Sequence, residues 1–364
     1  MSNATDPLRV AVVGLRIHAG GLDPDRDHGL IKSFYGRDDA RIVAYCEWDP
    51  DESAALESLA KYDPSAQIYT SLEELLDREA FEVAVVMLPP NEATPASEKL
   101  AQAGKHLFIE KQAARTAPEL LPLLELAAQR NLVVRIGYPW PSHPVAHEIR
   151  RCLDGGVLGK LLAMEARLVT VQIAPGLREP DHWMYRLETE GGGILHMEGG
   201  HWLALFQMFA QARVRSVTAL CSRRTDVSQE GVEDAATVAL EYANGVHACL
   251  HMGYLLTAAG PRNDTYMAVR GDLGAATWDD VGSGTLVVNS AAHQWQGAPQ
   301  RTFNMPPAPR AVYAEQWGYN YVSEFLKAVR EGGRALVSIE DGHHFLQIFD
   351  AAYESSRTGR RIEL

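Results

Sequence analysis

Five short apolar runs in the first third of the chain constrain its fold more than any other feature. They are rich in Val, Ile, Leu, Ala and Phe, and they cover residues 8–13, 41–46, 81–88, 106–110 and 132–137. Continuous runs of this kind are typical of strands that are buried on both faces of a parallel sheet. Segments with helical patterns separate several of them, namely ESAALESLAKY, SLEELLDR and ATPASEKLAQAGK. The alternation predicts a doubly wound α/β domain.

A different pattern begins after PWPSHP, residues 139–144, where three prolines interrupt the alternation. A short helix is expected at 145–153, and longer strand-like segments follow at 160–173, 214–222, 234–242, 245–252 and 265–271. Asn244-Gly245 predicts a hairpin turn between two of them. Two helices are expected near the end, one with Val322, Phe325 and Leu326 on one face, the other with Ser338 three residues before Asp341. We therefore expect one domain in residues 1–138 and a second in 139–364, whose last helix could pack back on the first.

Composition and charge exclude several classes of function. The chain has 364 residues, enough for two domains, and a net charge of −13 without a basic stripe, which argues against binding to nucleic acid or to an anionic membrane. Its four cysteines are widely spaced and form no CxxC motif, which is typical of a protein in the reducing cytoplasm. We find no signal peptide, and no apolar run approaches the roughly 18 residues of a membrane span.

The end of the first apolar run is where a dinucleotide-binding turn belongs. Gly14 fits the first position of the GxGxxG fingerprint, but Arg16 and Ala19 occupy the other two glycine positions, so this motif alone is weak. Glu47 ends the second run, where a carboxylate can accept hydrogen bonds from ribose hydroxyls and would repel a 2′-phosphate. This favours NAD over NADP, and a solvated glutamate at a strand end is the alternative.

Two stretches raise the question of a metal. Asp23, Asp25 and Asp27 alternate, but the twelfth position counted from Asp23 is Phe34, where a calcium loop needs a glutamate. His196 lies five residues from His201, about 140° around a helix, so the two imidazoles cannot easily share an ion. We therefore expect no metal site, and His196 is interpreted as a core or interface residue.

IEKQAART, residues 109–116, carries the most specific signal. Together with VAVVGL, YCEWDPDES, VVMLPPN, EGGGIL and AAYESSRTGRRIEL, it resembles the glucose–fructose oxidoreductase/inositol dehydrogenase (Gfo/Idh/MocA) family, in a consistent order from about residue 8 to 364. The resemblance implies an N-terminal NAD(P)-binding Rossmann domain, with a doubly wound parallel sheet, and a C-terminal α+β domain with a large, mostly antiparallel open sheet. It implies hydride transfer between NAD and a CH–OH or carbonyl carbon of a sugar, inositol or related polyol.

The resemblance also implies a homodimer or homotetramer assembled through the open sheet. The segments 236–242 and 247–255 are expected to present apolar outer faces that such an assembly would cover.

The family's Glu-Lys-Pro motif falls on Glu110, Lys111 and Gln112, so Gln112 replaces the usual proline. Lys111 is then the catalytic lysine beside the nicotinamide, where an ammonium stabilises the developing alkoxide. A solvated lysine after a strand is the alternative. The resemblance implies this set of cofactor-binding residues: Gly14, Arg16, Ile17, Glu47, Pro89, Asn91, Glu110 and Lys111.

GGGILHMEGGH, residues 191–201, matches the family's Gly-Gly-Gly-x-Leu-x-Asp-x-Gly-x-His pattern except for one residue. Met197 stands where the family has an aspartate that contacts substrate. His201 is the candidate general base, since an imidazole exchanges protons near neutral pH. We hypothesise that Glu198, three residues before His201, takes over part of the carboxylate's role, and a salt bridge elsewhere is the alternative. The glycines would let the loop enter a helix without Cβ atoms crowding a ligand.

Three aromatic residues, Trp140, Trp183 and Tyr319, could stack on a sugar face, and simple packing is the alternative. The sequence thus predicts an NAD-dependent dehydrogenase or reductase with Lys111 and His201 in the acting roles. Two other functions stay open. NAD could be used transiently, to permit elimination or glycoside hydrolysis without net redox change, or the chain could bind ligand without catalysis.

Overall fold

The computed structural model describes residues 6–15, 30–171, 182–225, 230–255, 263–281, 283–305 and 315–364. The chain divides into two compact units. Unit 1 consists of residues 1–139 and 309–343, and unit 2 consists of residues 140–308 and 344–364. The sequence analysis kept 309–343 in the second domain, whereas these residues belong to the first compact unit. The packing of the helix at 315–331 on the parallel sheet of unit 1 accounts for this difference.

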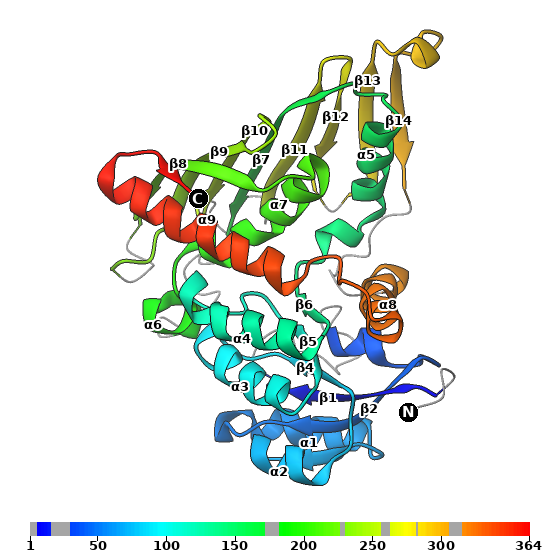
Figure 1. Cartoon of the computed structure of the whole chain (residues 1–364), viewed down its shortest axis with the longest axis vertical. Helices are drawn as coiled ribbons and strands as arrows, with labels where there is room; N and C mark the ends of the chain where they lie inside the picture. Colours follow the sequence, from blue (N-terminus) through cyan, green and yellow to red (C-terminus); the bar gives the residue numbers. More distant parts are fainter. Residues whose placement is uncertain are drawn as a thin grey trace. The chain divides into compact units, whose positions relative to one another are not determined.

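Unit 1 is built on a six-stranded parallel sheet in the order β3-β2-β1-β4-β5-β6 (Figure 1). The predicted doubly wound sheet is therefore confirmed. The strands are β1 (Leu8–Val13), β2 (Ala40–Cys46), β3 (Gln67–Tyr69), β4 (Val83–Val86), β5 (His106–Ile109) and β6 (Val134–Ile136). All of β4 is buried, as its unbroken apolar run predicts. The short edge strand β3 has no such run, and the sequence analysis missed it.

The helices of unit 1 begin at recognisable signals. Ser71 caps α2, because its hydroxyl accepts a hydrogen bond from the backbone N–H of Glu74 at 3.3 Å. Helix α3 starts at Pro90, a position where a missing N–H costs nothing, and it contacts β4 and β5. The helices are η1 (Leu30–Phe34), η2 (Pro50–Glu52), α1 (Ser53–Tyr62), α2 (Leu72–Arg78), α3 (Pro90–Gln102), α4 (Ala117–Arg130) and α8 (Glu315–Glu331).

Helix α8 joins the core of unit 1 through its apolar face. The rings of Tyr321 and Phe325 each lie 5.3 Å from that of Phe108 on β5, at interplanar angles of 87° and 89°. Such edge-to-face pairs are favourable beyond the area that they bury. Val322 and Leu326 complete the buried stripe, which confirms the helical face predicted from the sequence. Because Phe108, the ring that both Tyr321 and Phe325 contact, belongs to β5, α8 packs on the parallel sheet of unit 1.

Unit 2 contains a nine-stranded sheet in the order β14-β13-β12-β11-β7-β10-β9-β8-β15 (Figure 1). Among the described strands, every neighbouring pair is antiparallel except β7 and β10. The strands are β7 (Leu161–Thr170), β8 (Val214–Ser222), β9 (Ala235–Tyr242), β10 (His247–Gly253), β11 (Asn263–Gly271), β12 (Gly274–Asp279), β13 (Thr285–Ser290), β14 (Gln300–Asn304) and β15 (Ile362–Glu363). The mostly antiparallel sheet is confirmed, and so is the hairpin turn, where Gly245 has a φ of 83°.

Helices cover one face of this sheet: α5 (Pro144–Asp154), α7 (Ile194–Ala210) and the later part of α9 (Ile339–Thr358). Helix α7 contacts β7, β9 and β10. At the start of α9, the Asp341 carboxylate accepts from the backbone N–H of Ser338 at 3.0 Å, as the sequence spacing predicts. None of the described helices is long and apolar enough to cross a membrane.

The other face of the sheet is more polar than the sequence analysis expected. Along β10, the apolar side chains are buried, while His247, Cys249 and His251 alternate with them and are exposed. Cross-strand ion pairs lie on the same sheet, among them Arg167 with Asp264 at 2.8 Å. The prediction that segments 236–242 and 247–255 present apolar outer faces is therefore wrong for most of their length, because their large apolar side chains as far as Met252 are buried, while Leu255 is 43% exposed. The homodimer or homotetramer stays a prediction without that support.

Replacement of Phe325 by alanine is expected to lower the free energy of unfolding by about 3–5 kcal/mol, because it removes a fully buried ring and leaves a cavity against Phe108. Lys327→Ala, at an exposed position of the same helix, is the control and should change it by less than about 0.5 kcal/mol. Urea denaturation followed by circular dichroism measures both. Equal effects of the two substitutions would show that α8 is not part of this core.

Candidate functional site

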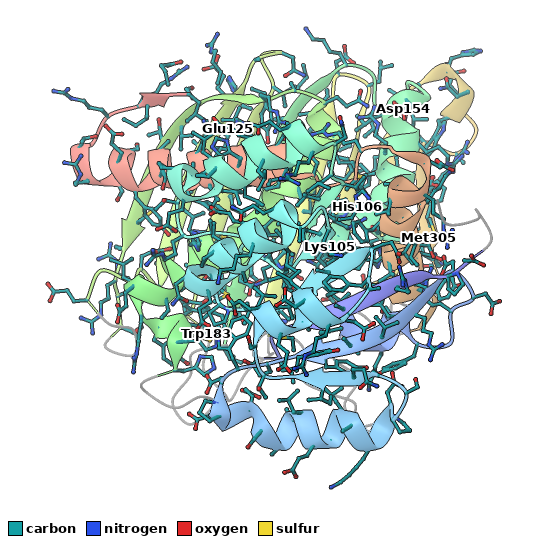
Figure 2. The ribbon with its side chains drawn as sticks, turned by 60° about the horizontal axis from the view of Figure 1, so that its bottom comes forward. Lys105, His106, Glu125, Asp154, Trp183 and Met305 are labelled. Carbon is teal, nitrogen blue, oxygen red and sulfur yellow. The ribbon has the colours of Figure 1, made fainter. Side chains whose placement is uncertain are left out.

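Several predicted cofactor-binding residues of unit 1 follow the carboxyl ends of parallel strands. Gly14 follows β1, Glu47 follows β2 and Glu110 follows β5. Ligands of open parallel sheets bind at this edge. His106, labelled in Figure 2, begins β5 and so marks the opposite edge from Glu110 and Lys111. Arg16, Ile17 and the aspartates at 23, 25 and 27 lie outside the described residues, so their predicted roles are not tested.

Gly14 occupies a turn that admits no side chain. Its φ is 84°, and an added Cβ would lie 2.5 Å from Cδ2 of Leu88 and 2.8 Å from the carbonyl oxygen of Met87. Its N–H donates to the carbonyl of Cys46 at 2.8 Å, which holds the turn against β2. The bare backbone fits the close approach that a diphosphate requires.

The side chain of Glu47 is buried and fully engaged with the backbone. It is 1% exposed, so the alternative of a solvated glutamate is wrong. One carboxylate oxygen accepts from the N–H of Leu15 at 2.8 Å, and the other accepts from the N–H groups of Trp48 and Asp49 at 2.8 and 2.9 Å. These bonds compensate the burial of a charge, and they tie the end of β1 to the end of β2. Glu47 thus shapes the turn, and ribose binding stays a prediction.

A cavity of about 390 Å³ lies beside Trp48, between the segments that follow β2 and β3, the start of α2, and α3. Trp48, Leu72 and Pro95 supply apolar surface, while Glu92 accepts a hydrogen bond from the Trp48 indole N–H at 3.1 Å. At the mouth, the Lys99 ammonium contacts Glu73 at 2.5 Å and lowers the pKa of that carboxyl to about 2. A flat apolar group with a few polar atoms, such as a nucleobase, suits this lining. The sequence analysis missed this cavity, whose lining comes from separate segments.

The segment after β5 is buried and tied to its neighbours. Glu110 is fully buried, and its carboxylate accepts from the backbone N–H of Lys111 at 3.2 Å. Lys111 is 5% exposed, so the alternative of a solvated lysine is wrong, and its peptide bond to Gln112 is cis. The Thr94 hydroxyl of α3 donates to the carbonyl of Ala113 at 2.9 Å. The motif is thereby fixed to α3, the helix that begins just after Pro89.

Arg135 on β6 is a buried cation that the sequence analysis did not identify. It is fully buried, its guanidinium lies 4.1 Å from the centre of the Tyr321 ring, and Glu324 lies 3.5 Å away. Two residues further on, a Cβ at Gly137 would lie 3.0 Å from the Cα of Glu110. The strand thus packs closely on the motif. An arginine inside an otherwise apolar run was the available signal.

In unit 2, helix α7 carries the second set of candidate residues. His201 is 8% exposed, and its Nε2 lies 3.5 Å from a carboxylate oxygen of Glu198. The three-residue spacing therefore does bring the carboxylate to the imidazole, as hypothesised. Met197 is 4% exposed on the same helix. Whether Glu198 acts through His201 in a reaction stays a prediction.

The glycines before α7 make room for protein groups. A Cβ on Gly193 would lie 1.7 Å from the carbonyl oxygen of Glu233, and one on Gly192 would lie 2.1 Å from the Tyr353 hydroxyl. These glycines therefore have a packing role, and the expectation that they also spare a ligand stays a prediction. The Glu233 carboxylate accepts from the N–H groups of Gly193 and Leu195 at 2.7 and 2.9 Å, and so it caps the helix.

Glu233 is an unusual cap because its side chain is almost completely buried. Burial raises the pKa of Glu233, while its bonds to the N–H groups and to the Tyr353 hydroxyl, at 3.1 Å, oppose the change. Local sequence patterns could not reveal the cap, since it lies far along the chain from the helix that it holds.

His196 belongs to the core of unit 2, which agrees with one of the two interpretations made from the sequence. Its Nδ1 lies 3.1 Å from Glu190, and both residues are fully buried. Within the described ranges, no group of three or more His, Cys, Asp or Glu side chains could hold a metal ion.

The three aromatic candidates all contact protein groups. Trp140 lies 6.0 Å from both His143 and Trp278, measured between ring centres. Trp183, labelled in Figure 2, lies 5.4 Å from the His182 ring. The Tyr319 ring is covered on one face by the Arg37 guanidinium at 3.9 Å. Packing explains each of them, and their stacking on a sugar stays a prediction.

Comparisons with known proteins match both units to one family. A model described as an oxidoreductase family with an NAD-binding Rossmann fold matches residues 8–138, and a model of the GFO/IDH/MocA C-terminal domain matches residues 146–277. Inositol 2-dehydrogenase of Rhizobium meliloti is 24% identical over 336 residues, which cover 92% of this chain and 94% of that protein. D-glucoside 3-dehydrogenase of Escherichia coli is 23% identical and covers 99% of this chain and 98% of that protein.

Solved structures share the whole fold. Levoglucosan dehydrogenase in complex with NADH and levoglucosan superposes with a TM-score of 0.82 at 20% identity, and the match covers 98% of this chain and 99% of that one. An inositol dehydrogenase homolog from Azotobacter vinelandii in complex with NAD+ has a TM-score of 0.81 at 19% identity, with full coverage of both chains. These structures show the fold, and the two family models confirm the resemblance found from the sequence motifs.

Gly193→Ala is expected to destabilise unit 2 by at least about 3 kcal/mol, because its Cβ would overlap a backbone carbonyl that cannot move without disturbing β9. Gly297→Ala is the control, since a Cβ there meets nothing within 4 Å. Thermal unfolding of both variants measures the difference. A Gly193→Ala variant as stable as the control would contradict the packing role.

His143 should make stability depend on pH. Burial, aided by nearby His147, lowers the pKa of His143 to about 4 from 6.5, so its contribution is fully present above pH 6.5 and is lost as the pH falls toward 4. Between pH 7 and 4, the wild type should lose about 3 kcal/mol more than His143→Asn. Asparagine can still cap α5, as the His143 imidazole does through the Val145 N–H. Urea titrations at both pH values test this, with exposed His247→Asn expected to match the wild type.

Proposed function

We propose that this chain, which belongs to the Gfo/Idh/MocA family of oxidoreductases, transfers a hydride between NAD and a CH–OH or carbonyl carbon of a sugar, inositol or related polyol. The observation that carries the proposal is Lys111, a lysine 5% exposed at the carboxyl end of β5, directly after the buried Glu110. A buried ammonium at the ligand-binding edge of a parallel sheet is suited to stabilise negative charge on a substrate oxygen. The names of the relatives, an inositol and a glucoside dehydrogenase, support the substrate class.

The residues of unit 1 fit NAD. The glycine turn at Gly14 would hold the diphosphate, Glu47 the adenosine ribose, and the cavity beside Trp48 the adenine. When bound, NAD supplies the hydride acceptor or donor. If the ribose binds beside Glu47 as proposed, a 2′-phosphate would bring further negative charge to this carboxylate, which favours NAD over NADP. Pro89 and Asn91, at the start of α3, complete the proposed set.

In the proposed reaction, one residue stabilises the charge on the substrate oxygen and another transfers its proton. Lys111 stabilises the substrate oxygen as it gains negative charge, and His201 removes its proton or returns it. Glu198, 3.5 Å from the His201 imidazole, stabilises the imidazolium that forms when the proton is taken. Met197 cannot do this, because a thioether is only a weak acceptor. Glu198 is therefore proposed as a positioning residue.

Isothermal titration with NAD and NADP, followed by a sugar and polyol screen that detects reduced nicotinamide, tests the function. We expect NAD to bind more tightly and at least one compound to be oxidised. Lys111→Met should then lower kcat by at least about a hundredfold, whereas Lys61→Met on an exposed turn of α1 should not change it. Two results would replace the proposal. Reduced cofactor that never accumulates during turnover would identify transient redox chemistry, and ligand binding without any product would identify a non-catalytic protein.

Glu198→Gln should reduce kcat at least about tenfold and shift the pH profile of kcat, because the amide keeps the shape but loses the charge that stabilises the imidazolium. Glu354→Gln, exposed on α9, is the control for loss of one carboxylate. A variant with wild-type kcat and an unshifted profile would show that Glu198 has a structural role only.

A further inference from the structure

Gln112 is a buried amide whose polar atoms have no hydrogen-bond partner among the described residues. The residue is 1% exposed, and within the described part of the chain neither its side-chain oxygen nor its side-chain nitrogen has a hydrogen-bond partner. A carboxamide offers two N–H donors and one oxygen acceptor. Burial of such a group without partners costs free energy at each unmet atom. Such an arrangement is rare in folded proteins and needs an explanation, and a polar group of a bound ligand is a suitable partner for this amide.

The backbone around Gln112 is held in place and cannot easily turn the amide away. The Thr94 hydroxyl donates to the carbonyl of the next residue, Ala113, and both Ala113 and Ala114 are buried. On the other side, the N–H of Glu110 donates to the carbonyl of Val86 on β4 at 2.8 Å. The amide therefore sits on a segment fixed to both β4 and α3.

A second amide at the same edge has an unmet acceptor. The side-chain oxygen of Asn91 is buried and has no partner among the residues described. Asn91 is the second residue of α3, which follows β4, and Gln112 follows β5. Since β4 and β5 are parallel neighbours, their carboxyl ends share one edge of the sheet. Two segments at this edge thus carry buried amide atoms that have no hydrogen-bond partner among the described residues.

We propose that Gln112 binds the carboxamide of the nicotinamide and thereby selects the cofactor's head group. Two carboxamides can pair reciprocally, with each N–H donating to the oxygen of the other. This match uses both a donor and the acceptor of Gln112, and the residue is adjacent to Lys111. The inference rests on the proposed function, because it requires NAD to bind to unit 1.

The test compares dinucleotides by calorimetry in the absence of substrate. Gln112→Met keeps the length of the side chain but cannot pair, so it should lower the affinity for NAD about tenfold. Affinity for ADP-ribose, which lacks the nicotinamide, should change less than about twofold, and this also shows that the variant is folded. The wild type should bind 3-acetylpyridine adenine dinucleotide, which has no N–H donor, more weakly than NAD. That preference should disappear in Gln112→Met.

The stability of the ligand-free protein gives an independent readout. Removal of an unpaired buried amide should raise the melting temperature of Gln112→Met, while its affinity for NAD falls. Gln112→Leu serves as a second variant, and Gln102→Met, exposed on α3, is the control that should alter neither value. A purely structural role would instead lower the melting temperature and leave the preference for NAD over the acetylpyridine analogue intact.

The remaining outcomes separate this inference from the proposed function. If the wild type binds NAD and Gln112→Met binds it equally well, the pairing is refuted while the oxidoreductase function stands. If only the KM for the sugar or polyol rises, the amide recognises substrate and the inference is wrong. If the wild type binds no dinucleotide, both proposals fail.

Discussion

Buried carboxylates that accept backbone N–H groups set the positions on which both candidate regions depend. Glu47 joins the end of β1 to the end of β2 through Leu15, and Glu233 holds the start of α7 through Gly193 and Leu195. Each carboxylate is almost completely buried, and each is compensated by several fixed donors. A charge satisfied in this way resists local rearrangement, since movement of either segment would leave it unpaired in a medium of low polarity.

Buried polar groups that have hydrogen-bond partners in the chain differ in their role from buried polar atoms that have none among the described residues. Glu47, Glu110 and Glu233 accept hydrogen bonds from their own chain, and they stiffen the turns that carry Gly14, Lys111 and the first turn of α7. The Gln112 amide is also buried, as is the side-chain oxygen of Asn91, yet among the described residues these atoms have no hydrogen-bond partner. A region of this kind combines a rigid frame with a few unmet polar atoms, which is what selective binding of a small molecule requires.

The sequence predicts the fold well where one local signal decides the structure. Unbroken apolar runs located β1, β4 and β5, and the Asn244-Gly245 pair located the turn between β9 and β10. Strands β12, β13 and β14 were missed because GAATWD and QRTFN each contain a single large apolar side chain and TLVVNS contains a run of only three. The placement of α8 also failed, since membership of unit 1 depends on Phe108 meeting Phe325, a contact between distant parts of the chain.

The candidate residues show the same limit. Motif spacing identified Lys111, His201 and Glu198 as candidates, because each lies in a motif made of residues that are close together in the sequence. Glu233 and Arg135 could not be found in that way, because their importance lies in what they touch. The packing role of the glycines before α7 was not predicted, since only coordinates reveal that Glu233 and Tyr353 fill the space beside them.

The discontinuity of unit 1 bears on how the chain acquires its structure during synthesis. A ribosome releases β5, with Phe108, long before it releases α8, and the whole of residues 140–308 comes between them. Until α8 emerges, the Phe108 ring of β5 lacks the cover that Tyr321 and Phe325 provide. The partly synthesised unit 1 therefore exposes apolar surface, which is the kind of surface that chaperones bind. A fragment that stops at residue 139 would keep all six parallel strands and still aggregate, whereas grafting 315–331 onto it should give a self-sufficient domain.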